Sequence, residues 1–280
     1  MVRYIYQLSS VYLFILFIVV SIAVSLVGVF IVRRFIPLEL RYRDNPVIGN
    51  ISALISIIYG VLAGLIALYL INNISYTADA VQREANAIAN MYRYSKWLKE
   101  PVRSEVQNDI KDYLKKVIEV EWPIMQAGKN INDSIVAKVH DKFVIEDLTG
   151  KLLSYSLAKP TDGYLVQNML GEIRDLYNAR EQRIHMSLVA LDANIWIVLI
   201  IGTILTIVIN YFFGMNFYLH LLTVSAVALM AAAMMFLLVT LDRPFQGELV
   251  IAPAAFNAVL TYVEKDTQIS MVSPEKNFKG

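Results

Sequence analysis

The sequence contains no cysteine and only three histidines. The absence of cysteine excludes disulfides, thiolate metal ligands and cysteine nucleophiles. His140, His185 and His220 are scattered along the chain and lack the three- or four-residue spacing that places two metal ligands on one face of a helix. We therefore expect neither a metal site nor a cofactor.

Motifs of enzymes and of nucleic-acid-binding proteins are also missing. The chain has no glycine-rich phosphate loop and no Gly-x-Ser-x-Gly nucleophile motif. Its formal net charge is +1 and no long basic block occurs, so nucleic acid is not an expected partner. These absences predict a protein that is not an enzyme.

Charge is scarce and unevenly distributed. Charged residues make up 18% of the chain and hydrophobic residues 57%, whereas soluble domains carry about 25% charged residues. Residues 79–192 hold 16 of the 25 Lys and Arg and 17 of the 24 Asp and Glu. We therefore predict an integral membrane protein with one polar domain between its apolar spans. The lipid bilayer is thus an expected partner.

Hydrophobic residues gather in stretches long enough to cross a membrane. Residues 4–32 are uncharged over 29 positions, residues 51–72 carry no charge, and residues 193–241 are uncharged over 49 positions. Because about 20 helical residues cross the hydrocarbon layer, the last stretch suffices for two crossings with a turn near Gly214. The sequence thus predicts an all-α membrane protein with four transmembrane helices.

We divide the chain at the ends of these stretches. No glycine or proline follows residue 72 until Pro101, so we expect the second helix to continue beyond the membrane. A later amphipathic helix is expected to stop at Glu121-Trp122-Pro123, and a further amphipathic stretch is expected at residues 253–263. The predicted parts are a first span (1–33), an extracytoplasmic connector (34–50), a second span (51–72), a cytosolic helical domain (73–192), a transmembrane hairpin (193–241) and a cytosolic C-terminal tail (242–280).

The distribution of cations indicates the orientation. The hairpin turn, residues 214–220, has no Lys or Arg, whereas cations flank the membrane on the side of the polar domain, which favours a cytosolic domain. Four arginines at or in the connector, Arg33, Arg34, Arg41 and Arg43, argue for the opposite orientation. We predict a multi-pass protein of the plasma membrane, which is the cytoplasmic (inner) membrane if the source is a bacterium.

The second span carries two kinds of side chain at helical spacing. Bulky residues that recur every four positions, Ile57, Val61 and Leu65, either pack against lipid or form the constriction of a pore. Small residues let helices approach closely in lipid, so we also expect a helix-packing face. Its members are Ser56, Gly60, Ala63, Gly64 and Ala67.

Four charged residues, Glu84, Glu121, Arg180 and Arg183, lie on helices with apolar periodicity. Buried ion pairs between the acids and the arginines are one structural role. Alternatively, rings of these residues in an oligomer line a cytosolic vestibule. A ring of arginines would attract anions there, whereas a ring of Glu84 would favour cations. The two rings predict opposite selectivity.

Several short motifs recur in the order of a known family. The two most specific are Glu121-Trp122-Pro123 and Asp242-Arg243-Pro244-Phe245-x-Gly247. These two motifs lie at the separation found in the bestrophin-like family, also called DUF4239, and the chain resembles this family over roughly residues 45–260. The other matching residues are Tyr59-Gly60-Val61-Leu62 with Gly64, Glu84-Ala85, Tyr113, Arg180 with Arg183, and Trp196.

The resemblance, which extends distantly to bestrophin ion channels, implies a homopentameric ring that conducts small ions passively through a central pore lined by the second span. Leu62-Ala63-Gly64-Leu65 resembles the bestrophin Val-Leu-Gly-Phe, which puts the constriction at Ile57, Val61 and Leu65. Bestrophins have aromatic rings at the constriction where this chain has Val61 and Leu65. The acidic cluster that binds calcium in animal bestrophins is also missing here, so we expect no calcium gate. The alternative is a non-conducting membrane scaffold or sensor whose cytosolic helices bind a partner.

Overall fold

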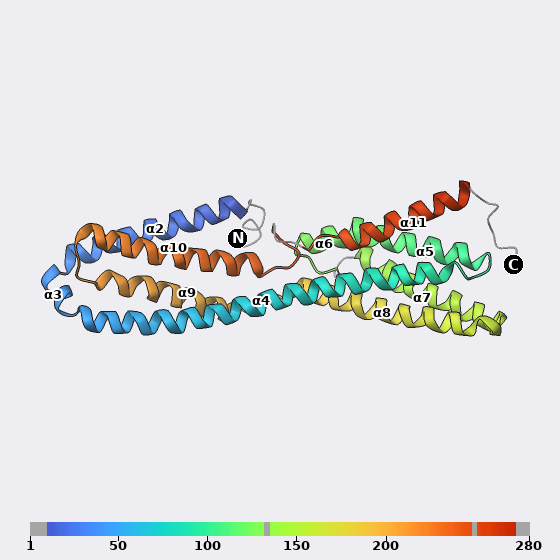
Figure 1. The fold of residues 1–280 in the computed structure, drawn as a ribbon, viewed down its shortest axis with the longest axis horizontal. Helices are drawn as coiled ribbons and strands as arrows, with labels where there is room; N and C mark the ends of the chain where they lie inside the picture. Colours follow the sequence, from blue (N-terminus) through green and yellow to red (C-terminus); the bar gives the residue numbers. More distant parts are fainter. Residues whose placement is uncertain (1–9, 132–134, 248–250, 273–280) are drawn as a thin grey trace. The chain divides into compact units, whose positions relative to one another are not determined.

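The computed structural model describes residues 10–131, 135–247 and 251–272, and every regular element in these ranges is a helix (Figure 1). The chain divides into two compact units. Unit 1 comprises residues 1–74, 190–243 and 247–249, and unit 2 comprises residues 75–189, 244–246 and 250–280.

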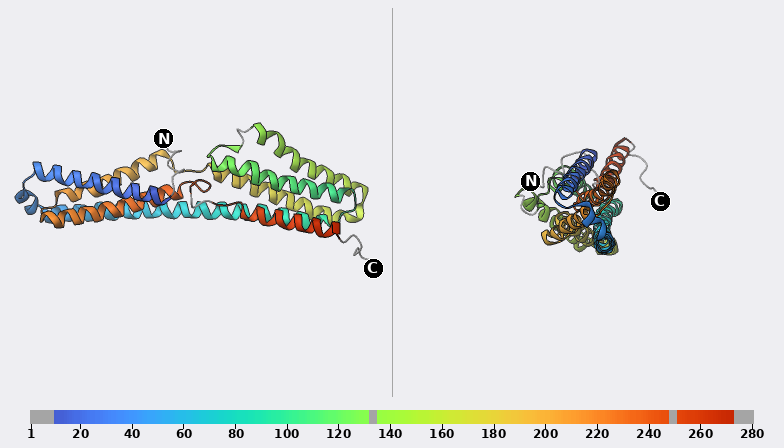
Figure 2. Two further views of the ribbon diagram at one scale, coloured as in Figure 1. Left: turned by 90° about the horizontal axis from the view of Figure 1, so that it is seen from above. Right: turned by 90° about the vertical axis from the view of Figure 1, so that its left-hand side faces the viewer.

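Four helices are long and apolar enough to cross a membrane, which confirms the predicted number of spans. In unit 1 they are α2 (Ser10–Phe35), the first part of α4 (Asn45–Ser95), α9 (Ala193–Val208) with its 3-10 extension η4 (Ile209–Phe212), and α10 (Phe217–Leu241). Helix α2 packs along α10, and α9 contacts both (Figure 1, Figure 2).

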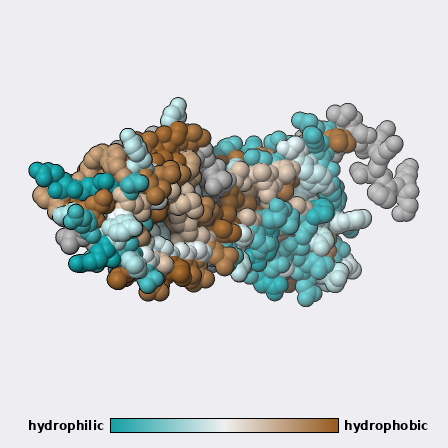
Figure 3. All heavy atoms as spheres, turned by 60° about the vertical axis from the view of Figure 1, so that its left-hand side comes forward, coloured by the Kyte–Doolittle hydropathy of each residue, from teal (hydrophilic) through white to brown (hydrophobic). Residues whose placement is uncertain are grey.

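Surface polarity separates the two units. The spheres of unit 1 are mainly hydrophobic around its helices, with hydrophilic atoms at the end that carries α3 (Leu38–Arg43) (Figure 3). The surface of unit 2 is mainly hydrophilic (Figure 3). Because apolar side chains are stable against lipid and charged ones are not, this distribution assigns unit 1 to the membrane.

One end of unit 1 is closed by an interaction between the first residue of α4 and the turn before α10. The Asn45 side-chain amide donates to the Gly214 carbonyl at 2.9 Å, and the Gly214 amide donates to Asn45 Oδ1 at 2.8 Å. A Cβ atom at Gly214 would overlap the backbone of Tyr42. Glycine is therefore required here for close approach of two backbone segments.

Unit 2 is built from the rest of α4 and helices of later sequence. They are α5 (Val102–Lys116), the π-helical turn η1 (Val117–Glu121), α6 (Trp122–Gln126), α7 (Ile135–Ala158), the 3-10 turn η3 (Pro160–Asp162), α8 (Gly163–Leu188) and α11 (Ala254–Val272). The amphipathic pattern of α5 buries Val106, Ile110 and Tyr113 in a shared core. Apolar burial of such helical faces drives the packing of this unit.

One feature differs from the expectation. The helix after Pro101 does not stop at Glu121-Trp122-Pro123 but continues through η1 and α6 to Gln126. A π-helical turn has wider hydrogen-bond spacing than an α-helix, and it directly precedes α6, which has Pro123 in its first turn. The helix can therefore pass a proline that would otherwise end it.

The C-terminal region contains one further helix. The amphipathic stretch expected at residues 253–263 lies within α11, which extends from Ala254 to Val272 and buries Phe256 and Val263 in the core of unit 2. This helix has an apolar face, and burying that face against α5 and η1 removes it from water. The segment is thus an integral part of unit 2.

Tight packing around Gly202 predicts a sensitive position in unit 1. A Cβ atom at Gly202 would lie 2.5 Å from Cδ2 of Tyr59, whose hydroxyl is 2.8 Å from Thr203 Oγ1. We expect Gly202→Ala to displace the ring and lower the unfolding free energy by about 1–3 kcal/mol, measured by denaturation in detergent.

The control for this variant is Gly171→Ala in α8, where a Cβ atom meets nothing within 4 Å. We expect it to be neutral or to stabilise by up to about 1 kcal/mol, because alanine favours a helix. Equal destabilisation by both variants would contradict the packing argument.

Candidate functional site

Helix α4 has two distinct faces within unit 1. Tyr59, Ala63 and Ala67 are buried in a cluster with residues of α9 and α10. On another face, Ile57, Val61 and Leu65 are 63%, 59% and 61% exposed. The bulky row predicted from the sequence therefore points away from the other helices of its own chain.

The small residues of α4 fall into two groups. Ala63 and Ala67 are buried against helices of the same chain, whereas Ser56, Gly60 and Gly64 are exposed. A Cβ atom at Gly60 or Gly64 would meet no atom within 4 Å. The two glycines thus leave open space beside the bulky row, while the alanines serve packing inside the chain.

Polar residues lie on the same face of α4 beyond both ends of the bulky row. Asn50 precedes Ile57 by about two helical turns, and Asn72 follows Leu65 by the same interval. Both asparagines are exposed. The face therefore changes from polar to apolar and back to polar along the helix.

The four predicted charged residues meet in the core of unit 2. Arg183 Nε donates to Glu84 Oε2 at 2.6 Å, and Arg183 Nη2 donates to both Glu84 Oε1 and Glu121 Oε2. Arg180 Nη2 donates to Glu121 Oε1 at 2.9 Å. The Tyr113 hydroxyl donates to Glu84 Oε1 at 2.7 Å. All four charged side chains are buried, so this arrangement favours their structural role.

Aromatic rings enclose this cluster. The Arg183 guanidinium carbon lies 5.8 Å from the ring centroids of both Trp122 and Phe256. Trp122 also packs edge-on against Phe245, with centroids 5.3 Å apart. Residues of the two most specific motifs, far apart in the sequence, therefore share one core around a buried arginine.

Electrostatics keep the Glu121 carboxylate ionised. Burial by itself raises the pKa of Glu121, but the charges of Arg183 and Arg180 and their hydrogen bonds outweigh burial and lower the pKa to about 2. Burial and the nearby charges of Glu84 and Glu121 raise the pKa of the Tyr113 hydroxyl well above its usual value, so Tyr113 remains a donor. Tyr113 was not predicted as a site residue, although its phenol on the apolar face of the helix after Pro101 is the sequence signal for a buried donor.

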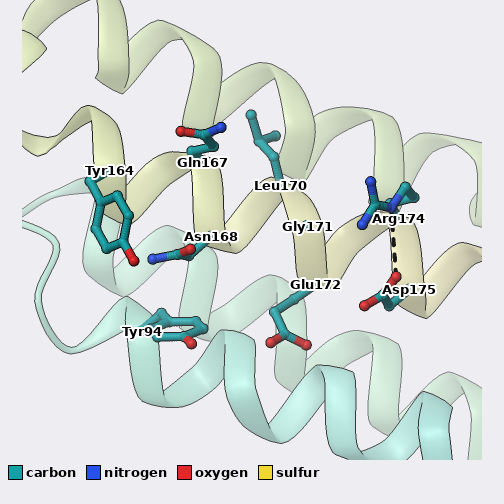
Figure 4. A pocket seen from close by; sticks show the side chains of 9 residues that line it. All are labelled: Tyr94, Tyr164, Gln167, Asn168, Leu170, Gly171, Glu172, Arg174 and Asp175. Atoms are coloured by element: carbon teal, nitrogen blue, oxygen red, sulfur yellow. Dashed lines mark ion pairs between the residues drawn. The ribbon is translucent and has the colours of Figure 1, made fainter.

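A surface cavity of about 560 Å³ lies between α4 and α8 of unit 2. Tyr94, Tyr164, Asn168 and Glu172 line it, with the exposed pair of Arg174 and Asp175 at one side (Figure 4). The Glu172 carboxylate accepts a hydrogen bond from Asn90 at 3.0 Å. The lining contains no nucleophile paired with a base, and the described residues contain no group of three potential metal ligands.

The fold and the apolar helices of unit 1 define a multi-pass α-helical membrane protein. The model of the bestrophin-like domain matches residues 19–256. The chain therefore belongs to the bestrophin-like family. No curated protein matches the chain in sequence.

Solved structures show the same fold. A bacterial bestrophin homolog from Klebsiella pneumoniae superposes with a TM-score of 0.69 at 10% identity, over 91% of this chain and 98% of that chain. A variant of a protein described as a membrane protein gives a TM-score of 0.68 at 11% identity, with the same coverage. At these identities the likeness establishes the fold alone.

The bridging role of Arg183 predicts a large loss of stability on its removal. Arg183→Met leaves two buried carboxylates without their principal partner, and we expect it to lower the unfolding free energy by about 3–5 kcal/mol. Thermal loss of helicity in detergent measures this. Arg83→Met is the control, because Arg83 is exposed and pairs with Asp79 across one helical turn, a pair worth about 0.3–0.5 kcal/mol. Similar losses in both variants would contradict the assignment.

The lowered pKa of Glu121 predicts a specific dependence of stability on pH. Its folded pKa of about 2 lies below the unfolded value of 4.5. The ionised carboxylate therefore contributes stability above pH 4.5, and this contribution is lost as the pH falls from 4.5 towards 2. We expect the wild type to lose about 3 kcal/mol more than Glu121→Gln over this interval.

The measurement is the midpoint of thermal unfolding between pH 2.5 and 7. Glu181→Gln removes an exposed carboxylate from α8, the helix that carries both arginines, and we expect it to retain the wild-type dependence. A Glu121→Gln profile parallel to that of the wild type would refute the electrostatic coupling.

Proposed function

We propose that this protein is a homo-oligomeric channel whose copies surround a pore for small ions, lined by α4. The observation that carries the proposal is the exposed row of Ile57, Val61 and Leu65, bounded by Asn50 and Asn72. An apolar constriction between polar entrances conducts ions when it is hydrated and stops them when it dries. Membership of the bestrophin-like family supports this function.

The open space at Gly60 and Gly64 supports an assembly around this row. Small residues in membrane helices allow neighbouring helices to approach closely. If each α4 receives a helix of the next copy at these glycines, the adjacent bulky row points towards the symmetry axis. We propose a pentamer, the stoichiometry implied by the resemblance to bestrophins, with unit 2 in the cytosol.

The buried cluster of Glu84, Glu121, Arg180 and Arg183 has no role in the selectivity of this channel. Glu84 and Arg183 are fully buried and bonded to each other, so their charges are largely neutralised before an ion approaches. Structural ion pairing is therefore favoured over rings of free charge in a vestibule. Conduction then depends on the hydration of the α4 constriction.

Replacing Val61 tests the constriction directly. We expect Val61→Ser to raise the open-channel current in planar bilayers several-fold, because a hydroxyl stabilises water in an apolar constriction. Val198→Ser is the matched control, since Val198 is 50% exposed on α9 and lies outside the proposed pore. Equal currents in the wild type and Val61→Ser would exclude Val61 from the conduction path.

The absence of cysteine allows a second readout. In Val61→Cys the new thiol is the only one in the chain, so a charged water-soluble thiol reagent modifies a single position. We expect the reagent to block current through Val61→Cys and to leave Val198→Cys unaffected. Wild-type protein that forms oligomers without any current would instead favour the scaffold or sensor function.

A further inference from the structure

Two arginines contact the same turn at the end of unit 1 that carries α3. Arg33, in the last turn of α2, donates from Nη1 to the Met215 carbonyl at 3.3 Å. Arg41, in α3, donates from Nη1 to the Phe213 carbonyl at 3.3 Å. Both guanidinium groups thus hold the backbone of the turn before α10.

The third basic group at this end is His220, which is fully buried. Its Nε2 lies 3.1 Å from the Asn210 carbonyl, which can only accept a hydrogen bond, so Nε2 carries the proton. Its Nδ1 then accepts from Arg33 Nη1 at 3.3 Å. His220 is therefore neutral in this arrangement and supplies no negative charge to the arginines.

Within the described residues, neither Arg33 nor Arg41 forms an ion pair. The nearby carboxylate of Asp44 pairs with Arg43 instead, at 3.2 Å. Arg41 is only 4% exposed, and its Nε has no hydrogen-bond partner among the described atoms. Burial and then the positive charge of Arg33 lower the pKa of Arg41. A covered guanidinium beside a second one is unfavourable unless an anion joins them.

The location indicates the kind of anion. Arg33 lies at the end of a membrane-spanning helix, the level at which arginine side chains reach the lipid headgroups. Guanidinium groups bind phosphate oxygens through paired N–H donors. We propose that Arg33 and Arg41 bind the phosphate group of a membrane lipid. This site gives two of the four arginines at the connector a role other than setting orientation.

Lipid binding to purified full-length protein tests the proposal. Native mass spectrometry measures the fraction of protein that retains phosphatidylglycerol, with diacylglycerol as the probe that lacks a phosphate group and inorganic phosphate as the free anion. We expect retention of phosphatidylglycerol but not of diacylglycerol. Arg41→Gln should weaken this binding about tenfold, the effect of losing a hydrogen bond to a charged group.

The matched control is Arg43→Gln, which removes the same charge from α3 at an exposed position that already has a carboxylate partner. We expect it to bind phosphatidylglycerol like the wild type. Because Arg41 also holds the Phe213 carbonyl, Arg41→Lys is compared as well. It keeps the charge but not the paired donors, and intermediate binding supports the phosphate site.

Three results would overturn the proposal. The first is equal lipid retention by the wild type, Arg41→Gln and Arg41→Lys. The second is binding of inorganic phosphate that Arg41→Gln weakens while retention of phosphatidylglycerol is unchanged, which would identify a site for a free anion. The third is loss of oligomers in Glu39→Gln to the same degree as in Arg41→Gln, which would assign the anion to a carboxylate of a second copy.

Discussion

The structure of unit 2 depends on one buried guanidinium. Arg183 of α8 binds Glu84 of α4 and Glu121 of η1, so a single side chain links three segments that are distant in the sequence. Charges removed from water are stable only when each has its partners, and this requirement sets the register of the three segments. The π-helical turn is part of the same constraint, because it delivers Glu121 to the cluster and lets the chain continue past Pro123. The two motifs that most specifically indicate the bestrophin-like family thus contribute residues to the core around this arginine.

Unit 1 is held by different interactions, since lipid removes most of the hydrophobic driving force between its helices. Close fits, such as Tyr59 against Gly202, and polar contacts at the helix ends, such as Asn45 with Gly214, take its place. These contacts use one side of α4 and leave the side with Val61 uncovered. The proposed pore follows from this division, because an apolar face with open space at its glycines suits assembly with further copies.

Much of this architecture was predictable from local pattern. Charge-free stretches of sufficient length identified the four spans, and apolar periodicity identified the buried faces of α5 and α8. Charged residues on such faces, Glu121 and Arg183 among them, were recognisable as candidates for buried pairing. One prediction failed where a local signal was overridden. Pro123 normally ends a helix, but here the π-helical turn η1 precedes it and the helix continues to Gln126. The amphipathic stretch expected at residues 253–263 lies within α11, whose Phe256 is buried.

The sequence by itself determined the membrane character, the number of spans and the identity of the charged residues, because these properties depend on composition and on spacing along one helix. Only the tertiary structure decided which face of α4 is used inside the chain. Ala63 and Gly64 are adjacent small residues, so spacing cannot tell that one packs against a neighbouring helix and the other faces open space. The same holds for Arg41 and Arg43. Only the folded connector shows that Arg43 pairs with Asp44, whereas Arg41 is buried without a carboxylate partner among the described residues.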